Sequence, residues 1–243
     1  GIGQGNGAGP AIWACVSTPL FNALREDGYG TTFQSPITLA LMTITGFAFV
    51  DDTDLIQMRG SLKSDKDLFI RAQAQLIVWE QLLRTTGGAI EPTKSDWVFI
   101  RYKWAKGRSM YNYNKFPHNM YVRNHAKEEL PLRQLAIREA RKTLGVWIAA
   151  DCNWKEQAKD LQNKAEDWAS RLHDGNLQPA HVEMAVRTTI TKTLDYCLPA
   201  TSLTRKQCQQ VMTKLLPTIL PRMKVVRTLN REAVHLPRDY RGL

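Results

Sequence analysis

The stretch TGFAFVDDTDLIQM, residues 45–58, places two adjacent aspartates between two apolar runs. Aromatic and aliphatic residues precede Asp51-Asp52, and Leu55 and Ile56 follow the pair. Short apolar runs separated by a polar pair are typical of two antiparallel strands joined by a tight turn. The stretch therefore predicts a β-hairpin with Asp51 and Asp52 at its tip.

The aspartate pair has two interpretations. Aspartate is common in turns because its side chain bonds the nearby backbone, so the pair can be an ordinary polar turn. Phe49 and Val50 instead indicate a buried strand, which would bring two like charges to the edge of an apolar core and destabilise it unless a cation compensates them. Clustered carboxylates suit Mg²⁺, which takes one or two of them and fills its other positions with water and substrate phosphates. We favour a metal site.

The chain opens on GIGQGNGAGP, residues 1–10, in which Gly3, Gly5 and Ala8 satisfy the pattern G-x-G-x-x-G/A. A dinucleotide-binding loop follows a buried strand, and nothing apolar precedes Gly1. A phosphate-binding P-loop is excluded because no Gly-Lys-Ser/Thr follows. These residues alone leave three alternatives open: a nucleotide loop, a flexible linker, and a backbone that must lie close to something else.

The composition indicates a globular protein with a basic surface. The chain has 243 residues, 43% of them hydrophobic, and a net charge of +10. Residues 1–60 carry −3 and the remainder carries +13, which favours a polyanionic partner over a merely solvated surface. No apolar run is long enough to cross a membrane, so no membrane partner is expected.

The four cysteines are scattered and form no metal-binding spacing with the histidines. They predict reduced, mostly buried thiols in an intracellular protein, with nucleus and cytoplasm both open.

The periodicity predicts several further elements. Pro10 begins a helix that Pro19 should kink or split. Residues 67–86 form an amphipathic helix that ends at Gly87-Gly88. Strands follow from Asp96 to Trp104, then an irregular region over 105–127 and a helix over 133–143. In the last hundred residues, Asn153, Pro179 and Ser202 or Thr204 begin three helices, which short connections favour packing as an antiparallel bundle.

Four segments together resemble one family. Phe49-Val50-Asp51-Asp52 resembles the Y/F-x-D-D hairpin of reverse transcriptases. Gly3-Gln4-Gly5 with Gly9-Pro10 resembles the preceding Q-G-x-x-x-S-P segment, although Gly9 stands where the family often has serine. The loop over 87–94 resembles the family's later lysine loop, and Leu144-Gly145-Val146 resembles the L-G turn near the primer grip. Their order and rough spacing agree, and the helical tail is most similar to retrotransposon enzymes of the non-LTR type.

The resemblance implies an α+β fold, with a polymerase right-hand palm of antiparallel sheet and packed helices followed by a helical-bundle thumb. The palm would occupy residues 1–148 and the thumb 149–243. The implied activity is RNA-directed DNA polymerisation. Its partners would be an RNA template, a DNA primer and deoxynucleoside triphosphates. The family supplies a further metal-binding aspartate before the glutamine-glycine segment, so we expect the chain to be an incomplete active site and a fragment of a longer protein.

The resemblance also assigns roles to residues. Asp51 and Asp52 would hold two Mg²⁺ ions, with Mn²⁺ as an alternative, and Asp51 would be the more direct ligand. Lys94 would stabilise or protonate the leaving group, its other interpretation being a solvated loop lysine. Gln4 and Gly5 would form a loop over which template and nucleotide pass. Phe49 would pack beneath the metals.

Residues 94–142 combine twelve lysines and arginines with interleaved aromatic rings, a composition suited to nucleic acid. Arg138, Arg141 and Lys142 are candidate phosphate contacts. For Trp97, Phe99 and Trp104 we favour a place in the core of strands, and the role of the tyrosines is left open.

Three alternatives remain. An RNA-dependent RNA polymerase would more often show Gly-Asp-Asp at the hairpin. A non-catalytic nucleic-acid-binding remnant is compatible with an intact aspartate pair. A dinucleotide-dependent oxidoreductase is the most distant.

Overall fold

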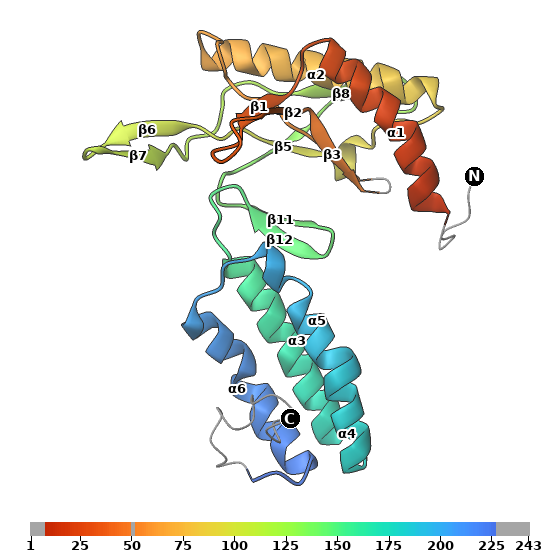
Figure 1. Ribbon diagram of the computed structural model, residues 1–243, viewed down its shortest axis with the longest axis vertical. Coiled ribbons are helices and arrows are strands. Elements are labelled where there is room, and N and C mark those ends of the chain that lie inside the picture. Colours follow the sequence, from red (N-terminus) through yellow and green to blue (C-terminus); the bar gives the residue numbers. More distant parts are fainter. Residues whose placement is uncertain (1–7, 50–51, 227–243) are drawn as a thin grey trace. The chain divides into compact units, whose positions relative to one another are not determined.

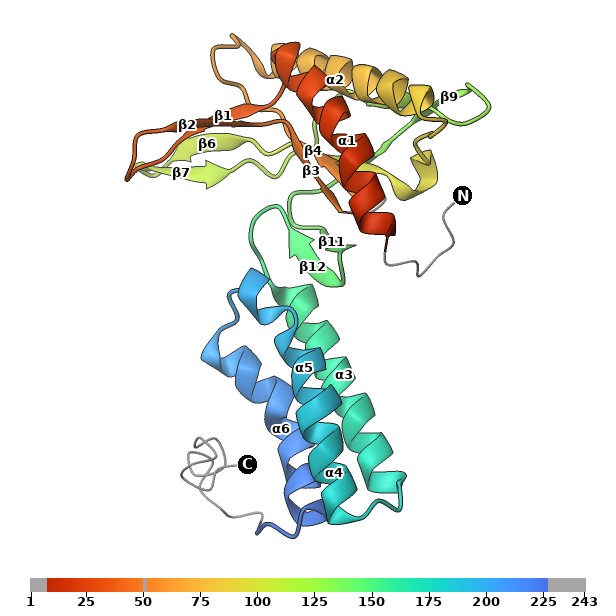
Figure 2. The same ribbon diagram turned by 45° about the vertical axis from the view of Figure 1, so that its right-hand side comes forward.

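The computed structural model describes residues 8–49 and 52–226 (Figure 1; Figure 2). Contacts divide the chain into two compact units. The described part of the first unit falls within Gly1–Phe99 and Asn114–Leu135, and that of the second within Ile100–Tyr113 and Ala136–Leu243. The boundary expected after residue 148 lies inside the second of these units. The chain is α+β, with short, mainly antiparallel strand pairs.

The first unit combines two long helices with short strands. Its elements are α1 (Gly9–Glu26), β1 (Thr31–Gln34), β2 (Leu41–Ile44), β3 (Gly46–Phe49), β4 (Asp52–Leu55), α2 (Asp65–Thr85), the 3₁₀ helix η1 (Pro92–Lys94), β5 (Asp96–Val98), β8 (Tyr121–Arg123), β9 (Glu129–Pro131) and β10 (Arg133–Leu135). Strands β1 and β2, β3 and β4, and β8 and β9 pair antiparallel, whereas β5 and β10 pair in parallel.

Helix α1 begins with a proline in its first turn, as predicted. Of the predicted kink or split at Pro19, the split is wrong. The helix runs from Gly9 to Glu26 with Pro19 inside it. Proline removes one backbone hydrogen bond and strains the preceding turn. Packing offsets this cost, because Leu20 and Leu24 are buried against Trp79 of α2.

Helix α2 matches its predicted position. Ser64 and Asp67 form a reciprocal capping box, in which each side chain accepts a hydrogen bond from the other residue's backbone. The helix ends before Gly87, whose φ of +80° suits glycine. Its apolar side meets two cores, one around Leu24 and Trp79 and one around Trp97 and Phe99.

Two of the three rings expected in the core are there. Trp97 and Phe99 are buried, together with Phe116 and Leu132. Trp104 is 76% exposed, so its predicted burial is wrong. It lies on a two-stranded hairpin, where a side chain has no second sheet or helix to pack against.

The helix predicted over 133–143 is also wrong. Arg133–Leu135 pairs in parallel with β5, and Ala140–Thr143 forms a hairpin strand. The segment has good helix formers, but pairing with neighbouring strands satisfies its backbone hydrogen bonds instead, because tertiary context overrides a weak propensity. The region over 105–127, expected to be irregular, likewise contains β8 and one further strand.

The second unit contains two hairpins and the helical bundle. Its elements are β6 (Tyr102–Ala105), β7 (Arg108–Tyr111), β11 (Ala140–Thr143), β12 (Val146–Ala149), α3 (Lys155–Asp174), α4 (Pro179–Ala185), the π-helical segment η2 (Val186–Ile190), α5 (Thr191–Asp195), the 3₁₀ helix η3 (Leu198–Ala200) and α6 (Arg205–Arg222).

The three predicted helices are present and pack side by side, the second as the continuous run α4, η2 and α5 (Figure 1). Thr204 begins the third through a capping box with Gln207. Asn153 lies one residue before the N-cap position of the first, and its Oδ1 accepts a hydrogen bond from the Lys155 amide at 3.1 Å. The bundle core is aliphatic, with Leu161, Ala165, Leu172, Val182, Ile190, Val211, Leu215 and Ile219 buried.

All four cysteines are free thiols, but the prediction that most are buried is wrong. Cys197 alone is buried, and burial raises the pKa of its thiol. The other three are exposed.

Candidate functional site

The aspartate-bearing stretch forms the predicted hairpin. Strands β3 and β4 pair antiparallel with Phe49 opposite Asp52, so residues 50 and 51 connect them. Those two residues, including Asp51, lie outside the described residues, as do Gln4 and Gly5. Asp52 begins β4 with an exposed side chain. The register therefore places the Asp52 carboxylate at the end of the hairpin next to its turn.

The strand before the aspartates is not the buried strand that the sequence predicted. The side chains of Phe47 and Phe49 are 58% and 59% exposed. In the described part of the chain, β3 pairs only with β4, and a two-stranded ladder covers neither of its own faces. The predicted burial of this strand is therefore wrong, whereas the position of Phe49 beneath the metals stays a prediction. The adjacency of the two carboxylates, rather than their burial, is therefore what favours a cation at this tip.

The other end of the hairpin is anchored by a glycine. A Cβ at Gly46 would collide with the carbonyl oxygen of Asp54 and lie 2.9 Å from Cε1 of Phe21 in α1. The missing side chain thus lets the strand approach both its partner strand and the helix. Phe21 in turn packs against Trp79 of α2, with ring centroids 4.9 Å apart and the rings tilted by 33°. The hairpin is held where the two long helices meet.

A buried glutamine of α2 provides a second anchor. Gln75 is 2% exposed, and its amide nitrogen donates to the carbonyl oxygens of Thr45 at 3.1 Å and Ile56 at 3.4 Å. These two residues flank the hairpin, and the amide of Ile56 also donates to the carbonyl of Thr45 at 3.0 Å. One side chain of α2 therefore holds the backbone on both sides of the hairpin base.

We expect Gln75→Leu to destabilise the protein by about 1–2 kcal/mol, because the carbonyl of Ile56 loses its buried donor and that of Thr45 keeps only one. Urea unfolding followed by circular dichroism measures this change. Gln81→Leu, on an exposed position of the same helix, is the control and should stay within about 0.5 kcal/mol of wild type. Equal effects of the two substitutions would contradict the anchoring role.

Lys94 ends the short helix η1 in the first unit and is exposed. It lies near Glu91, whose side chain accepts hydrogen bonds from the hydroxyl and the amide of Thr93 at 2.7 and 3.2 Å. The hydrogen bonds from Thr93 lower the pKa of Glu91, and the charge of Lys94 lowers it further. The loop thus presents an exposed lysine near a carboxylate whose pKa is lowered.

The three basic candidates of the second unit do not form one surface. Arg138 lies in the connection before β11, with its guanidinium 3.8 Å from the ring centroid of Tyr113. Arg141 and Lys142 are consecutive in β11, so their side chains leave opposite faces of the hairpin. Lys142 is also 3.9 Å from a carboxylate oxygen of Asp160 in α3. At most two of these three side chains can therefore contact the same flat surface of a ligand.

The hairpin β11–β12 itself is firmly attached to the bundle. Its turn residues Leu144 and Gly145 have φ angles of 49° and 83°, typical of a tight two-residue hairpin turn. The amide of Trp147 donates to the buried side chain of Gln157 in α3 at 2.7 Å, and the hydroxyl of Tyr196 donates to the carbonyl of Leu144 at 2.9 Å. The predicted L-G segment is therefore a turn of a hairpin that is held by Gln157 of α3 and by Tyr196, the residue after α5.

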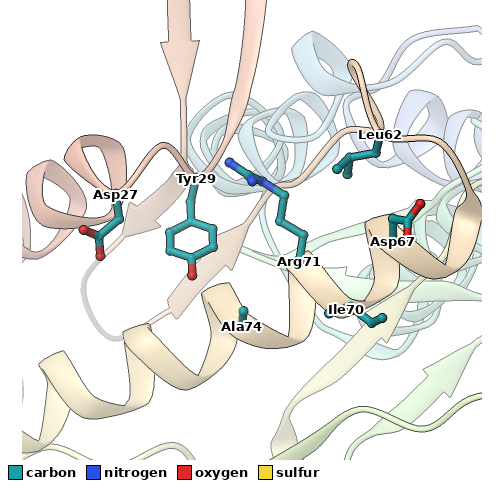
Figure 3. A pocket seen from close by; sticks show the side chains of 7 residues that line it. All are labelled: Asp27, Tyr29, Leu62, Asp67, Ile70, Arg71 and Ala74. Atoms are coloured by element: carbon teal, nitrogen blue, oxygen red, sulfur yellow. The ribbon is translucent and has the colours of Figure 1, made fainter.

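A shallow pocket lies where α1 ends beside α2 (Figure 3). Two of its three charged side chains already have partners: Arg71 donates to the carbonyl of Gly28 and lies 5.5 Å from the centre of the Tyr29 ring, and Asp67 caps α2. We assign no ligand to it.

A second pocket, of about 430 Å³, is lined by Arg84, Arg123 and Lys127. Beside it, buried Glu80 accepts hydrogen bonds from Nε of Arg84 and from the amide of Arg123, both at 3.0 Å. Its carboxylate compensates part of the positive charge. Among the described residues, no group of three or more histidines, cysteines or acidic residues is arranged to hold a metal ion.

The hairpin β6–β7, which has one aromatic face, was not predicted, because residues 105–127 were expected to be irregular. Tyr102 and Trp104 alternate with Lys103 and Ala105, the pattern of a strand with two different faces. The Lys106-Gly107 pair after them was the available signal for a hairpin turn. Both residues have positive φ.

The chain was compared with protein-family models, curated proteins and solved structures, and none of them matches it. Within the described residues, no helix combines the length and the apolar character needed to span a membrane.

Proposed function

We propose that the chain is the C-terminal palm and the thumb of a reverse transcriptase, an RNA-directed DNA polymerase of a non-LTR-like retrotransposon. The observation that carries the proposal is the F-V-D-D hairpin, whose register puts Asp52 opposite Phe49 and leaves a two-residue connection that contains Asp51. A pair of carboxylates beside a tight turn suits divalent cations that also bind nucleotide phosphates.

The order of the elements supports the same proposal. A helix begins at the end of the glycine segment, the hairpin follows, and α2 holds its base through Gln75. A loop with Lys94 comes next, then the Leu144-Gly145 turn, and finally a three-helix bundle. The α+β class and the predominance of antiparallel pairs are compatible with a palm, and the bundle is compatible with a thumb.

The residues at the hairpin tip fit a divalent cation. Asp52 has an exposed carboxylate and no ion pair in the described part of the chain. When bound, Mg²⁺ would activate a primer 3′-hydroxyl and neutralise charge on the triphosphate. Asp51 and Asp52 would hold it, and we assign the direct role to Asp51.

The remaining roles belong to protein groups. Lys94 would place an ammonium near the departing pyrophosphate and supply positive charge or a proton to it. Gln4 and Gly5 would contact template and nucleotide from the opening loop. The basic second unit would hold the phosphate backbone without reading sequence.

Primer extension on an RNA template tests the proposal. The protein is expressed in its natural reading frame, with whatever residues precede Gly1, and supplied with Mg²⁺ and deoxynucleotides. We expect template-directed incorporation. Incorporation of ribonucleotides alone would indicate an RNA polymerase, and duplex binding without any incorporation would indicate a non-catalytic remnant. Either result would overturn the proposal.

A further inference from the structure

The hairpin β6–β7 has one aromatic face. Tyr102 is directly opposite Tyr111, and Trp104 is directly opposite Ser109. Directly opposite residues of an antiparallel pair share a face, and so do residues two apart in a strand. The two tyrosines and the tryptophan therefore project from the same side. Lys103 and Arg108 project from the other side.

The rings continue beyond the hairpin as a ladder. The ring centroids of Tyr102 and Tyr111 are 5.0 Å apart, and those of Tyr111 and Tyr113 are 6.2 Å apart. The guanidinium of Arg138 then lies over Tyr113, 3.8 Å from its centroid. The side-chain hydrogen bond between Tyr102 and Tyr111 raises the pKa of Tyr111, and the charge of Asp151 raises it slightly further. We call Tyr102, Trp104, Tyr111, Tyr113 and Arg138 the aromatic ladder.

The ladder is open to solvent. Tyr102 is 63% exposed, Trp104 76% and Tyr113 41%. Cross-strand ring pairs stabilise a hairpin by roughly 0.2–1 kcal/mol, which accounts for Tyr102 with Tyr111. It does not account for Trp104, which faces a serine and buries little of its area. A large exposed aromatic group beside other rings indicates a binding surface.

The basic residues of this hairpin favour a negatively charged ligand for the aromatic ladder. Residues 100–113 contain four basic side chains and no acidic one. Lys106, in the turn, is exposed, as are Lys103 and Arg108 on the opposite face. Exposed rings on a hairpin whose charges are all basic suit unpaired nucleotides, because bases stack on the rings while phosphates contact cations such as Lys106 in the turn and Arg138 at the end of the ladder. A proline-rich peptide would use the rings but would not require the positive charge.

We infer that the aromatic ladder binds single-stranded nucleic acid, stacking successive bases on Trp104 and Tyr102. The role as a guide for an unpaired strand rests on the proposed function, since copying an RNA requires an unpaired template. The binding itself depends only on the ladder.

The test is the affinity of the full chain for labelled, mixed-sequence oligonucleotides, measured by fluorescence anisotropy. The arms are single-stranded RNA, single-stranded DNA and a blunt duplex. We expect Trp104→Ala to weaken single-strand binding roughly 5- to 150-fold, the range for loss of one stacked base, and to leave duplex binding nearly unchanged. Trp104→Phe should restore most of the affinity, because it keeps a stacking surface.

The matched control is Phe33→Ala, which removes an exposed ring from another two-stranded hairpin, β1–β2. It should leave every affinity unchanged. A response of RNA alone would specify a template strand, and a response of both single strands would specify any unpaired strand; each supports the ladder. Unaltered single-strand affinity in Trp104→Ala, or equal weakening of all three arms, would overturn it. A protein that binds single strands through Trp104 but never incorporates nucleotides would refute only the polymerase.

Discussion

Replacing Asp51 by asparagine should reduce primer extension by at least about 100-fold in the natural reading frame, while the fold stays intact. The substitution preserves shape but removes one of the two charges that would hold the divalent cations, so positioning of the 3′-hydroxyl and the triphosphate is lost. Without metal the variant should be slightly more stable than wild type, because repulsion with Asp52 is relieved. Single-turnover extension and thermal unfolding in EDTA measure the two effects.

Asp54→Asn is the matched control for this substitution. Asp54 lies in the same strand, two residues from Asp52, and is also exposed, but it pairs with Phe47 away from the turn. It removes the same charge from the hairpin at a distance from the tip. Extension by Asp54→Asn should remain within a few-fold of wild type. Normal extension by Asp51→Asn would reduce the aspartate pair to an ordinary turn.

Local signals in the sequence predicted the elements whose stability is local. The hairpin at 46–55 has short apolar runs on both sides of a polar pair, and Thr204, one of the two predicted starts of the third bundle helix, forms a capping box. The bundle follows from three apolar stripes with short connections. In each case the residues that decide the structure are within a few positions of one another.

The predictions that were wrong concern segments whose structure depends on residues far away in the sequence. Arg133–Leu135 is a strand because β5, more than 30 residues earlier, offers a parallel edge, and no local pattern reveals that edge. Trp104 and Phe49 are large apolar residues of the kind found in cores, yet each lies in a pair of strands where, among the described residues, no other element covers its side chain. The sequence specifies which residues are apolar, but whether a second layer covers them depends on the topology.

The candidate site was predictable in the same partial way. The positions of Asp52 and of the Leu144-Gly145 turn followed from the motifs. The anchoring by Gln75 did not, because a glutamine within a helix normally indicates a solvent-exposed position. Its burial depends on two carbonyl groups that flank the hairpin, which only the folded chain brings to it.

Binding of a primer–template duplex by the full chain should depend steeply on salt. The excess charge beyond residue 60 should neutralise about four to six phosphates, each contributing about −0.9 to the slope of log K against log salt. Raising salt from 50 to 200 mM should then weaken binding roughly 100- to 2,000-fold, without sequence preference. A dinucleotide-dependent enzyme would not bind the duplex.

Neutralising Arg138, Arg141 and Lys142 together should make that slope shallower by the equivalent of about one to two phosphate contacts rather than three. Arg141 and Lys142 leave opposite faces of β11, and Lys142 is already close to Asp160, so one flat duplex cannot engage the whole set. Asp51→Asn, which changes chemistry but not the basic unit, should leave the slope nearly unchanged. Anisotropy across a salt series with each variant measures these slopes. If wild type does not bind the duplex even at low salt, the second unit is not a polymerase thumb, whatever the aspartate pair does.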